Sequence, residues 1–198
     1  MIYLCRHGQT DYNRDARVQG HIDTALTPLG ERQAAAMGDL LHRVIGHERE
    51  VPWRIVASPL RRARKTAEII AAKLGRAVAF DDRLKEVTVG EWEGRLYADV
   101  AREHPDLAGD RNWFFKAPRA ETYDDMTARI GAWLAEQDDE PRRKLIVVSH
   151  GVAGRFLRGL YAGLSREALL EQDVPQDAIY RLHGGKIERL DCAAVSES

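Results

Sequence analysis

The sequence predicts an α/β fold, a three-layer α/β/α sandwich around a mostly parallel central sheet. Short apolar runs alternate along the chain with longer segments whose apolar residues recur at helical spacing. An alternation of this kind builds parallel sheets that helices cover on both faces. Two of the apolar runs also end in the same way, in a histidine followed by a glycine, at His7 and His150. In such sheets, reactive groups gather at the carboxyl ends of the strands.

The elements of the first half of the chain have clear start and stop signals. Thr27 and Pro28 are typical of a helix cap and a first helical position, and Gly75 is typical of a helix end. Ser58-Pro59 ends one strand and begins the next helix. The elements expected in this half are strands at 2–5, 54–58 and 77–80, a polar loop at 11–20, and helices at 28–45 and 59–74.

The second half contains an irregular segment, from Val87 to about Ala120, that is rich in aromatic, glycine and proline residues. We expect one short helix in it, near 96–103, and we expect it to cover a pocket within a single domain that spans 1–198. The elements expected after it are helices at 122–137 and 151–161, a strand at 144–149, a hairpin of strands at 178–182 and 186–190, and a disordered end at 193–198.

The composition excludes several classes of protein. The net charge is −1, so no overall positive field favours nucleic acid or a membrane, and an anion site must be a local cluster. No apolar run approaches the length of a membrane span, and a strand that starts at residue 2 leaves no room for a signal peptide. Cys5 and Cys192 are expected to be free thiols. We therefore expect a cytoplasmic protein that acts on a small molecule.

The two His-Gly pairs are the first functional signal. Arg6-His7-Gly8 follows the first apolar run, and Ser149-His150-Gly151 follows the strongest one. If the two parallel strands are neighbours, the imidazoles face a common point roughly 5 Å apart. Each glycine lets backbone N–H groups approach an anion closely. One pair alone fits a core histidine equally well, but two pairs favour a phosphate site.

Charged residues follow two further strands. Four cations lie within residues 61–65, where they oppose the dipole of a helix start unless a dianion binds there. We interpret Arg62 as pointing inward, and the other three as a solvent-exposed face made of Arg61, Arg64 and Lys65. After the third strand, Glu86 is the candidate for proton transfer, whereas Asp81 and Asp82 are interpreted as ion-pair partners of an arginine.

These residues and their neighbours resemble the histidine phosphatase superfamily, in its phosphoglycerate-mutase-like branch, which includes broad-specificity and alpha-ribazole phosphatases. The similarity runs in order over about residues 1–160. The motifs that carry it are Arg6-His7-Gly8-Gln9-Thr10 with Asn13; Gln19-Gly20, Asp23, Leu26-Thr27, Gly30 and Gln33-Ala34; Ser58-Pro59-Leu60, Arg62-Ala63 and Thr66-Ala67; Leu84, Glu86, Gly90 and Trp92-Glu93-Gly94; and Val148-Ser149-His150-Gly151. The departures from the pattern are Ala25, Lys65 and Ala120-Glu121-Thr122, the last of them near the pocket.

The resemblance implies a mechanism. His7 takes the phosphoryl group and becomes a phosphohistidine, while Arg6, Arg62 and His150 hold the phosphoryl oxygens. Glu86 protonates the leaving oxygen and then, as a carboxylate, activates the water that hydrolyses the intermediate. The further substrate-binding candidates are Asn13, Thr10, Gln19, Gly20 and Gly151.

Elementary chemistry agrees with this scheme. Phosphoryl transfer depends mostly on positioning and positive charge, and the forked donors of a guanidinium group match phosphate oxygens. His7 must be neutral to attack, and nearby cations lower its pKa. Glu86 must begin protonated, which predicts a raised pKa. Asn13 is expected to donate to the phosphate, and two roles stay open for Thr10, phosphate binding and orientation of the loop.

We expect neither a metal nor a cofactor. The remaining histidines lack the spacing of metal ligands and are interpreted as surface residues; they are His21, His42, His47, His104 and His183.

Three functions compete. A phosphatase of small phosphomonoesters is preferred, because Gly90–Gly94 resembles the phosphatases and the family's mutases carry longer insertions around the pocket. The alternatives are a phosphoglycerate mutase and a phospho-ligand-binding domain without catalysis. The segment Arg111–Lys116 could stack an aromatic leaving group or cover an exposed sheet edge, while Trp92 is expected in the core. The residues leave the particular substrate and the oligomeric state open.

Overall fold

The computed structural model describes residues 1–48 and 52–195. Its strands are β1 (Ile2–Arg6), β2 (Arg54–Ala57), β3 (Val78–Phe80), β4 (Leu145–Ser149), β5 (Ala178–His183) and β6 (Lys186–Asp191). Its α-helices are α1 (Asp11–Arg14), α2 (Pro28–Ile45), α3 (Arg61–Leu74), α4 (Tyr97–Glu103), α5 (Tyr123–Ala135), α6 (Gly151–Ala162) and α7 (Arg166–Glu171). Short 3-10 helices cover Asp82–Leu84, Gly90–Trp92, Pro105–Leu107 and Trp113–Lys116.

All six strands form one sheet in the order β3-β2-β4-β1-β5-β6. The first four of these run parallel to one another, and the hairpin of β5 and β6 adds two antiparallel strands beside β1. The strand β5 pairs with β1, and β6 pairs with β5 at the edge of the sheet. The prediction of a mostly parallel sheet is confirmed, and β1 lies in its interior between β4 and β5.

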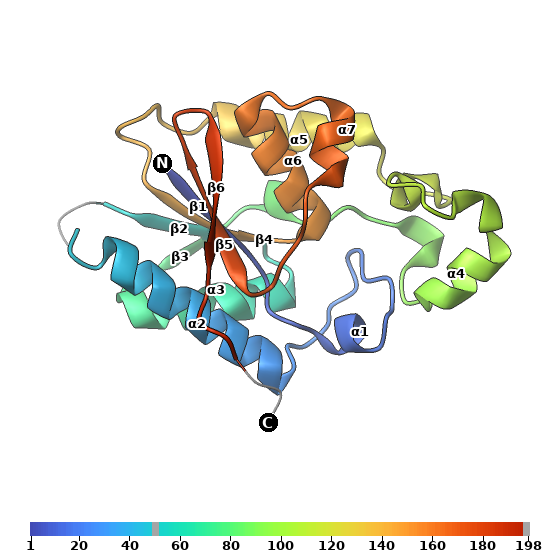
Figure 1. Ribbon diagram of the computed structural model, residues 1–198, viewed down its shortest axis with the longest axis horizontal. Helices are drawn as coiled ribbons and strands as arrows, with labels where there is room; N and C mark the ends of the chain where they lie inside the picture. Colours follow the sequence, from blue (N-terminus) through green and yellow to red (C-terminus); the bar gives the residue numbers. More distant parts are fainter. Residues whose placement is uncertain (49–51, 196–198) are drawn as a thin grey trace.

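Helices cover both faces of the sheet (Figure 1). The helices α2 and α3 pack on one face, and α5, α6 and α7 pack on the other. Tyr3 and Cys5 belong to the first of these cores, whereas Ile2 and Leu4 belong to the second. Successive side chains of a strand point to opposite faces, so β1 contributes to both cores. The three layers expected from the sequence are therefore confirmed.

Two short helices lie outside the predicted elements. The helix α1 interrupts the expected polar loop, because Thr10 and Asn13 form a capping box at its start. The helix α7 begins after Ser165, which caps it. The other predicted elements end within two residues of the observed bounds. Residues 193–195 have no regular structure, and the remainder of the end predicted to be disordered, 196–198, lies outside the described residues.

Two expectations from composition concern membrane-spanning helices and the two cysteines. No helix within residues 1–48 and 52–195 combines the length and the apolar character that crossing a bilayer requires. Cys5 is buried in β1, Cys192 is half-buried, and both are free thiols as predicted.

The turn after β1 passes very close to the start of α2. A Cβ atom on Gly8 would lie 2.1 Å from the carbonyl oxygen of Gly30, and one on Gly30 would lie 2.1 Å from the carbonyl oxygen of Gln9. Backbone contacts of this kind cannot be relieved by rotating a side chain. The N–H group of Gly8 donates to Oγ1 of Thr66 at 3.2 Å. The N–H group of Gly8 is thus already hydrogen-bonded within the protein, and Gly8 serves the close packing of this turn against α2.

We expect Gly8→Ala to lower the free energy of unfolding by about 1–3 kcal/mol, the usual range for overpacking. Gly131→Ala is the matched control, because a Cβ there has no neighbour nearer than 3.9 Å. Since Gly131 lies within α5, alanine should raise the stability by up to about 1 kcal/mol. Urea denaturation of both variants measures the difference, and a Gly8→Ala protein as stable as wild type would contradict the close approach.

Candidate active site

The sheet brings the two predicted histidines together. In the parallel pairing of β1 with β4, Arg6 lies opposite Ser149. The next residues, His7 and His150, therefore leave the same edge of the sheet, and their ring centroids lie 5.2 Å apart. This separation agrees with the one strand spacing expected from the sequence. Both side chains are buried, at 2% and 1% exposed.

The imidazole of His7 is held in one tautomer. Its Nδ1 lies 2.8 Å from the carbonyl oxygen of Gly8. A carbonyl oxygen only accepts, so Nδ1 carries the proton and Nε2 of the neutral ring keeps a lone pair. Burial, reinforced by Arg62 and Arg6, holds the pKa of His7 well below its ordinary value. The ring thus has the neutral form that a nucleophile requires.

His150 is anchored through one nitrogen only. Its Nε2 lies 2.7 Å from Oγ of Ser58, the residue after β2. Its Nδ1 is buried and has no hydrogen-bond partner among the described residues. Burial, with Arg62 and His7 as further causes, holds the pKa of His150 well below its ordinary value. The second nitrogen is therefore the one available to a ligand.

Both predicted arginines are held by backbone carbonyl groups. Arg62, at the start of α3, donates from Nη1 to Ile22 at 2.9 Å and from Nη2 to Gly20 at 2.7 Å. Arg6 donates from Nη1 to the carbonyl oxygen of Val174. The Nε atoms of both are buried without a partner among the described residues. Burial is the largest cause that lowers the pKa of both arginines, and the pKa of Arg62, at about 10, keeps that guanidinium group charged at neutral pH.

The carboxylate of Glu86 lies at the start of α6. Its Oε1 accepts from the backbone N–H groups of Val87 and Ala153 at 3.0 and 2.9 Å, and its Oε2 accepts from Val152 at 3.1 Å. The N-terminus of a helix favours a negative charge at this place. Glu86 is half-buried beside the two histidines. The expectation that it begins the reaction protonated stays a prediction.

Two side-chain amides lie at the site. Oδ1 of Asn13 accepts from the backbone N–H of Thr10 at 3.2 Å. Because a backbone N–H only donates, the NH2 group of Asn13 is the one left for a ligand. Oε1 of Gln19 lies 3.0 Å from the hydroxyl oxygen of Thr10 and 2.9 Å from that of Thr24. These contacts of Thr10 are those of a residue that orients the loop.

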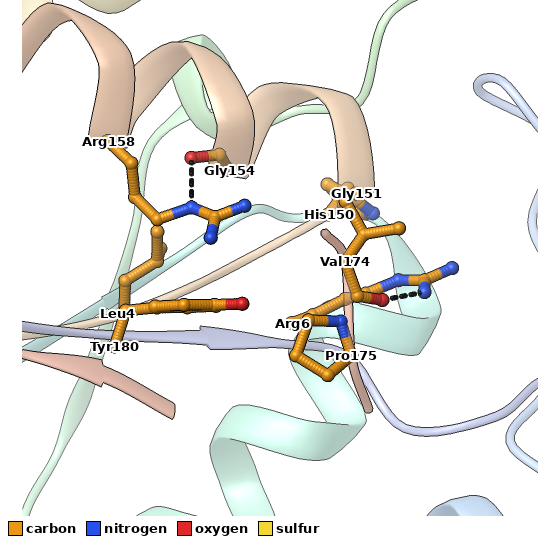
Figure 2. A pocket seen from close by; sticks show the side chains of 9 residues that line it. All are labelled: Leu4, Arg6, His150, Gly151, Gly154, Arg158, Val174, Pro175 and Tyr180. Carbon is orange, nitrogen blue, oxygen red and sulfur yellow. Dashed lines mark hydrogen bonds between the residues drawn. The ribbon is translucent and has the colours of Figure 1, made fainter. Parts of the chain in front are cut away.

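A pocket of about 80 Å³ opens beside His7. Most of the predicted site residues line it, together with aliphatic and aromatic residues that the sequence analysis did not assign to the site. The lining residues are Arg6, His7, Asn13, Val18, Gln19, Gly20, Arg62, Glu86, Val87, Val89, Tyr97, Trp113, Phe114 and Val152. Thr10 does not line the pocket. His150 and Gly151 line instead a cavity of about 10 Å³ that lies against Arg6 (Figure 2).

The connection between α7 and β5, residues 172–177, contacts Arg6 and His7; we call it the strap. Figure 2 shows the guanidinium group of Arg6 directed at the carbonyl group of Val174 in the strap. Arg158 of α6 fixes the strap in turn, because it donates to the carbonyl oxygen of Asp173 at 2.5 Å and lies 3.8 Å from the ring centre of Tyr180.

Sequence reasoning missed two residues that touch the site. Gln176 of the strap donates from Nε2 to the carbonyl oxygen of His7 at 3.2 Å and to Oδ1 of Asn13 at 3.0 Å. His21, which is exposed as predicted, donates from Nε2 to the carbonyl oxygen of Glu86 at 2.7 Å. No motif or periodicity marks either residue, and only the three-dimensional contacts reveal them.

The charged residues around the pocket follow the sequence interpretation with one exception. Arg62 is buried, and the exposed face consists of Arg61, Arg64 and Lys65 as predicted. Asp81 pairs with Arg83 at 2.8 Å, which confirms its interpretation as the partner of an arginine. Asp82 pairs with Lys85 at 2.9 Å, so its expected arginine is wrong. The 3-10 turn at Asp82–Leu84 brings Lys85 within reach at i+3.

The aromatic residues of the segment Arg111–Lys116 have two kinds of neighbour, the pocket and the helices. Trp92 is buried at 3% exposed, as predicted, and Trp113 stacks on it at 6.2 Å. Trp113 and Phe114 line the pocket. Phe115 packs edge-on against Tyr123 and Phe156, on α5 and α6. The alternative in which these aromatics cover a sheet edge is therefore wrong for Phe115, which packs against helices.

Within residues 1–48 and 52–195, no group of three or more His, Cys, Asp or Glu residues is arranged to hold a metal ion. His42, His47 and His183 are exposed as predicted. The surface interpretation is wrong for His104, because its ring is half-buried and lies 4.8 Å from that of Trp92.

Comparison with known proteins shows which family this chain resembles in sequence and in fold. The model of the histidine phosphatase superfamily, branch 1, matches residues 2–189. The chain is 35% identical over 182 residues to glucosyl-3-phosphoglycerate phosphatase of Mycobacterium tuberculosis, covering 85% of this chain and 74% of the relative. It is 35% identical over 173 residues to the probable phosphoglycerate mutase GpmB of Citrobacter koseri, covering 82% and 75%. The structure of mycobacterial glucosyl-3-phosphoglycerate phosphatase with VO3 matches with a TM-score of 0.75 at 28% identity, covering 100% of this chain and 99% of that one.

The fold and the pocket define an α/β protein in which two buried histidines and two arginines meet at one edge of the sheet. The chain belongs to the histidine phosphatase superfamily, branch 1, over nearly its whole length. The resemblance drawn from the motifs is thereby confirmed. The names of the relatives agree with the predicted class of enzyme, the phosphoric monoester hydrolases.

The lowered pKa values of His7 and His150 predict how the stability depends on pH. Below about pH 6.5 the unfolded chain binds protons at both imidazoles, while the folded chain does not. The free energy of unfolding should therefore fall as the pH is lowered from 7 to 5, by up to about 1.4 kcal/mol per pH unit for each histidine. A variant with His7→Gln and His150→Gln should lose this part of the slope.

Urea denaturation of both proteins at several pH values measures the two slopes. Equal slopes in the wild type and the double variant would show that the two imidazoles titrate alike in the folded and unfolded chains.

Proposed function

We propose that this protein is a metal-independent phosphatase that hydrolyses small phosphomonoesters through a phosphohistidine on Nε2 of His7. One observation carries the proposal. Three buried nitrogen atoms around His7 have no partner among the described residues, namely Nε of Arg6, Nε of Arg62 and Nδ1 of His150. Buried polar groups are nearly always hydrogen-bonded, because an unpaired one costs about 1–3 kcal/mol. A phosphoryl group would supply the missing acceptors.

The first chemical step uses the neutral form of His7. The lone pair of Nε2 attacks phosphorus and forms the N–P bond as the bond from phosphorus to the leaving oxygen breaks. Glu86 transfers its proton to that oxygen, and the alcohol departs. The transition state is loose, and the guanidinium groups of Arg6 and Arg62 stabilise the negative charge of the phosphoryl group in it.

The second step returns the enzyme to its starting form. Glu86, now a carboxylate at the start of α6, takes a proton from water while the water oxygen attacks phosphorus. The N–P bond breaks, its electron pair returns to Nε2 of His7, and inorganic phosphate leaves. The N–H groups of Val152 and Ala153 favour the carboxylate between the two steps.

The relatives support the same chemistry. The protein of Mycobacterium tuberculosis at 35% identity is named a phosphatase, and structures of the mycobacterial enzyme are described with VO3 and with inorganic phosphate. The family model covers residues 2–189, which include every group used in the two steps.

We expect wild-type protein to release p-nitrophenol from p-nitrophenyl phosphate in the presence of a chelator, and His7→Ala to lose this activity by several orders of magnitude. The loss follows because the proposed covalent intermediate forms on His7 itself. His42→Ala is the matched control, since His42 is an exposed histidine on α2. Activity that survives in His7→Ala, or that needs an added metal ion, would contradict the proposal.

A phosphoglycerate mutase is the second candidate, because the relative from Citrobacter koseri is named as one. The two activities separate in one assay with 3-phosphoglycerate and a bisphosphoglycerate primer. Conversion to 2-phosphoglycerate without release of inorganic phosphate would favour the mutase, and release of phosphate would favour the phosphatase.

A further inference from the structure

An apolar cavity of about 210 Å³ lies next to the phosphate pocket. The helix α4 and the turn after it line this cavity, with Val100, Ala101 and Leu107 among the lining residues. Tyr97 and Trp113 line both the cavity and the phosphate pocket. Their rings meet edge to face with centroids 5.2 Å apart. The two spaces are therefore neighbours that share a pair of aromatic rings.

Tyr97 reaches from one space to the other. Its side chain is 45% exposed, so the ring is not locked into the core. Burial of the hydroxyl group and the charge of Glu86 raise the pKa of Tyr97, while Arg6 opposes them. The hydroxyl group thus lies near the charges of Glu86 and Arg6, and the ring borders the apolar cavity. The leaving group of an ester whose phosphoryl group is bound at His7 would lie beside this ring.

The lining of the cavity indicates what it can bind. None of its eight lining residues carries a carboxylate, ammonium or guanidinium group. His104 is the one imidazole among them, and its ring already lies against Trp92 at 4.8 Å. A sugar or polyol would find few hydrogen-bond partners here, whereas an aromatic or branched hydrocarbon would remove apolar surface from water.

We propose that this cavity receives the leaving group of the substrate and selects phosphate esters whose alcohol part is a flat aromatic or branched apolar group. The proposal rests on the proposed function for the position of the phosphoryl group at His7. Tyr97 and Trp113 are then the residues that discriminate between leaving groups.

Calorimetric binding of two uncleavable phosphonates tests the cavity without requiring turnover. Wild-type protein should bind 1-naphthylmethylphosphonate about tenfold more tightly than methylphosphonate. Ala101→Phe fills the cavity and should abolish this preference. Ala98→Phe is the matched control, because Ala98 is exposed on the same helix and does not line the cavity. Ala108→Phe, at a second lining position, repeats the test should Ala101→Phe fail to fold.

Equal affinity for the two phosphonates, or a preference that survives when the cavity is filled, would overturn this proposal. A protein that shows the preference but hydrolyses no phosphate ester would count against the proposed function and not against the cavity.

A second inference comes from the strap. Nε2 of Gln176 donates one hydrogen to the carbonyl oxygen of His7 and the other to Oδ1 of Asn13. The carbonyl group only accepts, so the orientation of the Gln176 amide is fixed. This amide in turn occupies the oxygen of Asn13 and leaves the Asn13 NH2 group for the phosphate pocket.

We infer that Gln176 is a positioning residue, which acts on the phosphoryl group through Asn13, while its bond to the carbonyl oxygen of His7 fixes its own amide. Without this donor, only the backbone N–H and the hydroxyl group of Thr10 hold Oδ1 of Asn13, so the amide is held less firmly with its NH2 group toward the pocket. This inference also rests on the proposed function, because it takes phosphate as the ligand of Asn13.

We expect Gln176→Leu to raise the Kd for inorganic phosphate about tenfold, the usual effect of one hydrogen bond to a charged group. Asn13→Leu should do the same, and the double variant should be no worse than either single one, because both changes remove the same contact. Gln172→Leu is the matched control in the strap, since its amide donates only to backbone oxygens of Arg155 and Leu169.

Calorimetry with inorganic phosphate and a thermal melt of each variant provide the readouts. Unchanged phosphate affinity in Gln176→Leu, or effects that multiply in the double variant, would overturn this inference. A wild-type protein that binds no phosphate would instead count against the proposed function.

Discussion

The structure depends on one electrostatic constraint, the burial of two guanidinium groups beside two neutral imidazoles. Arg62 bonds carbonyl groups of the loop at Gly20 and Ile22, and Arg6 bonds that of Val174. Backbone dipoles thus replace the carboxylates that would normally pair with buried arginines. A directly paired carboxylate would neutralise the charge that an anionic ligand needs. The loop and the strap therefore each supply carbonyl oxygens to a buried guanidinium group.

The same constraint sets the state of His7. Burial is the largest cause that lowers the pKa of His7, and the positive charges of Arg62 and Arg6 add to it, so the imidazole stays neutral. Glu86 is the acidic residue in the pocket lining. Backbone N–H groups at the start of α6 donate hydrogen bonds to its carboxylate. The site therefore keeps a net positive field and a neutral nucleophile at the same time, which phosphoryl transfer from a dianion requires.

The sequence predicts the helix ends and the strands that carry the site, because neighbouring residues in the chain specify them. Thr27, Pro28 and Gly75 set helix ends, and the apolar runs before His7 and His150 mark two strands whose parallel register then places both rings at one edge. Arg62 could be singled out because it lies near the apolar face of α3. These inferences need only the neighbours of each residue in the chain and the geometry of a parallel sheet.

The remaining parts depend on contacts that no local pattern encodes. The helices α1 and α7 have four and six residues, too few for a helical period to stand out. The pairing of Asp82 with Lys85 depends on a short 3-10 turn, and the contact of His104 with Trp92 depends on the path of the irregular segment. The strap is the clearest example, because Gln176 lies 169 residues from His7 along the chain.

The long separation between the strap and β1 has a consequence for synthesis. A ribosome adds about 5–20 residues per second, so Val174 and Gln176 follow Arg6 and His7 by roughly ten seconds or more. Strand β5, which flanks β1, is made later still. A chain whose translation stops after α6 carries its histidines and arginines but lacks the groups that hold Arg6 and Asn13 in place. Assembly of the site is thus among the last events in the making of this protein.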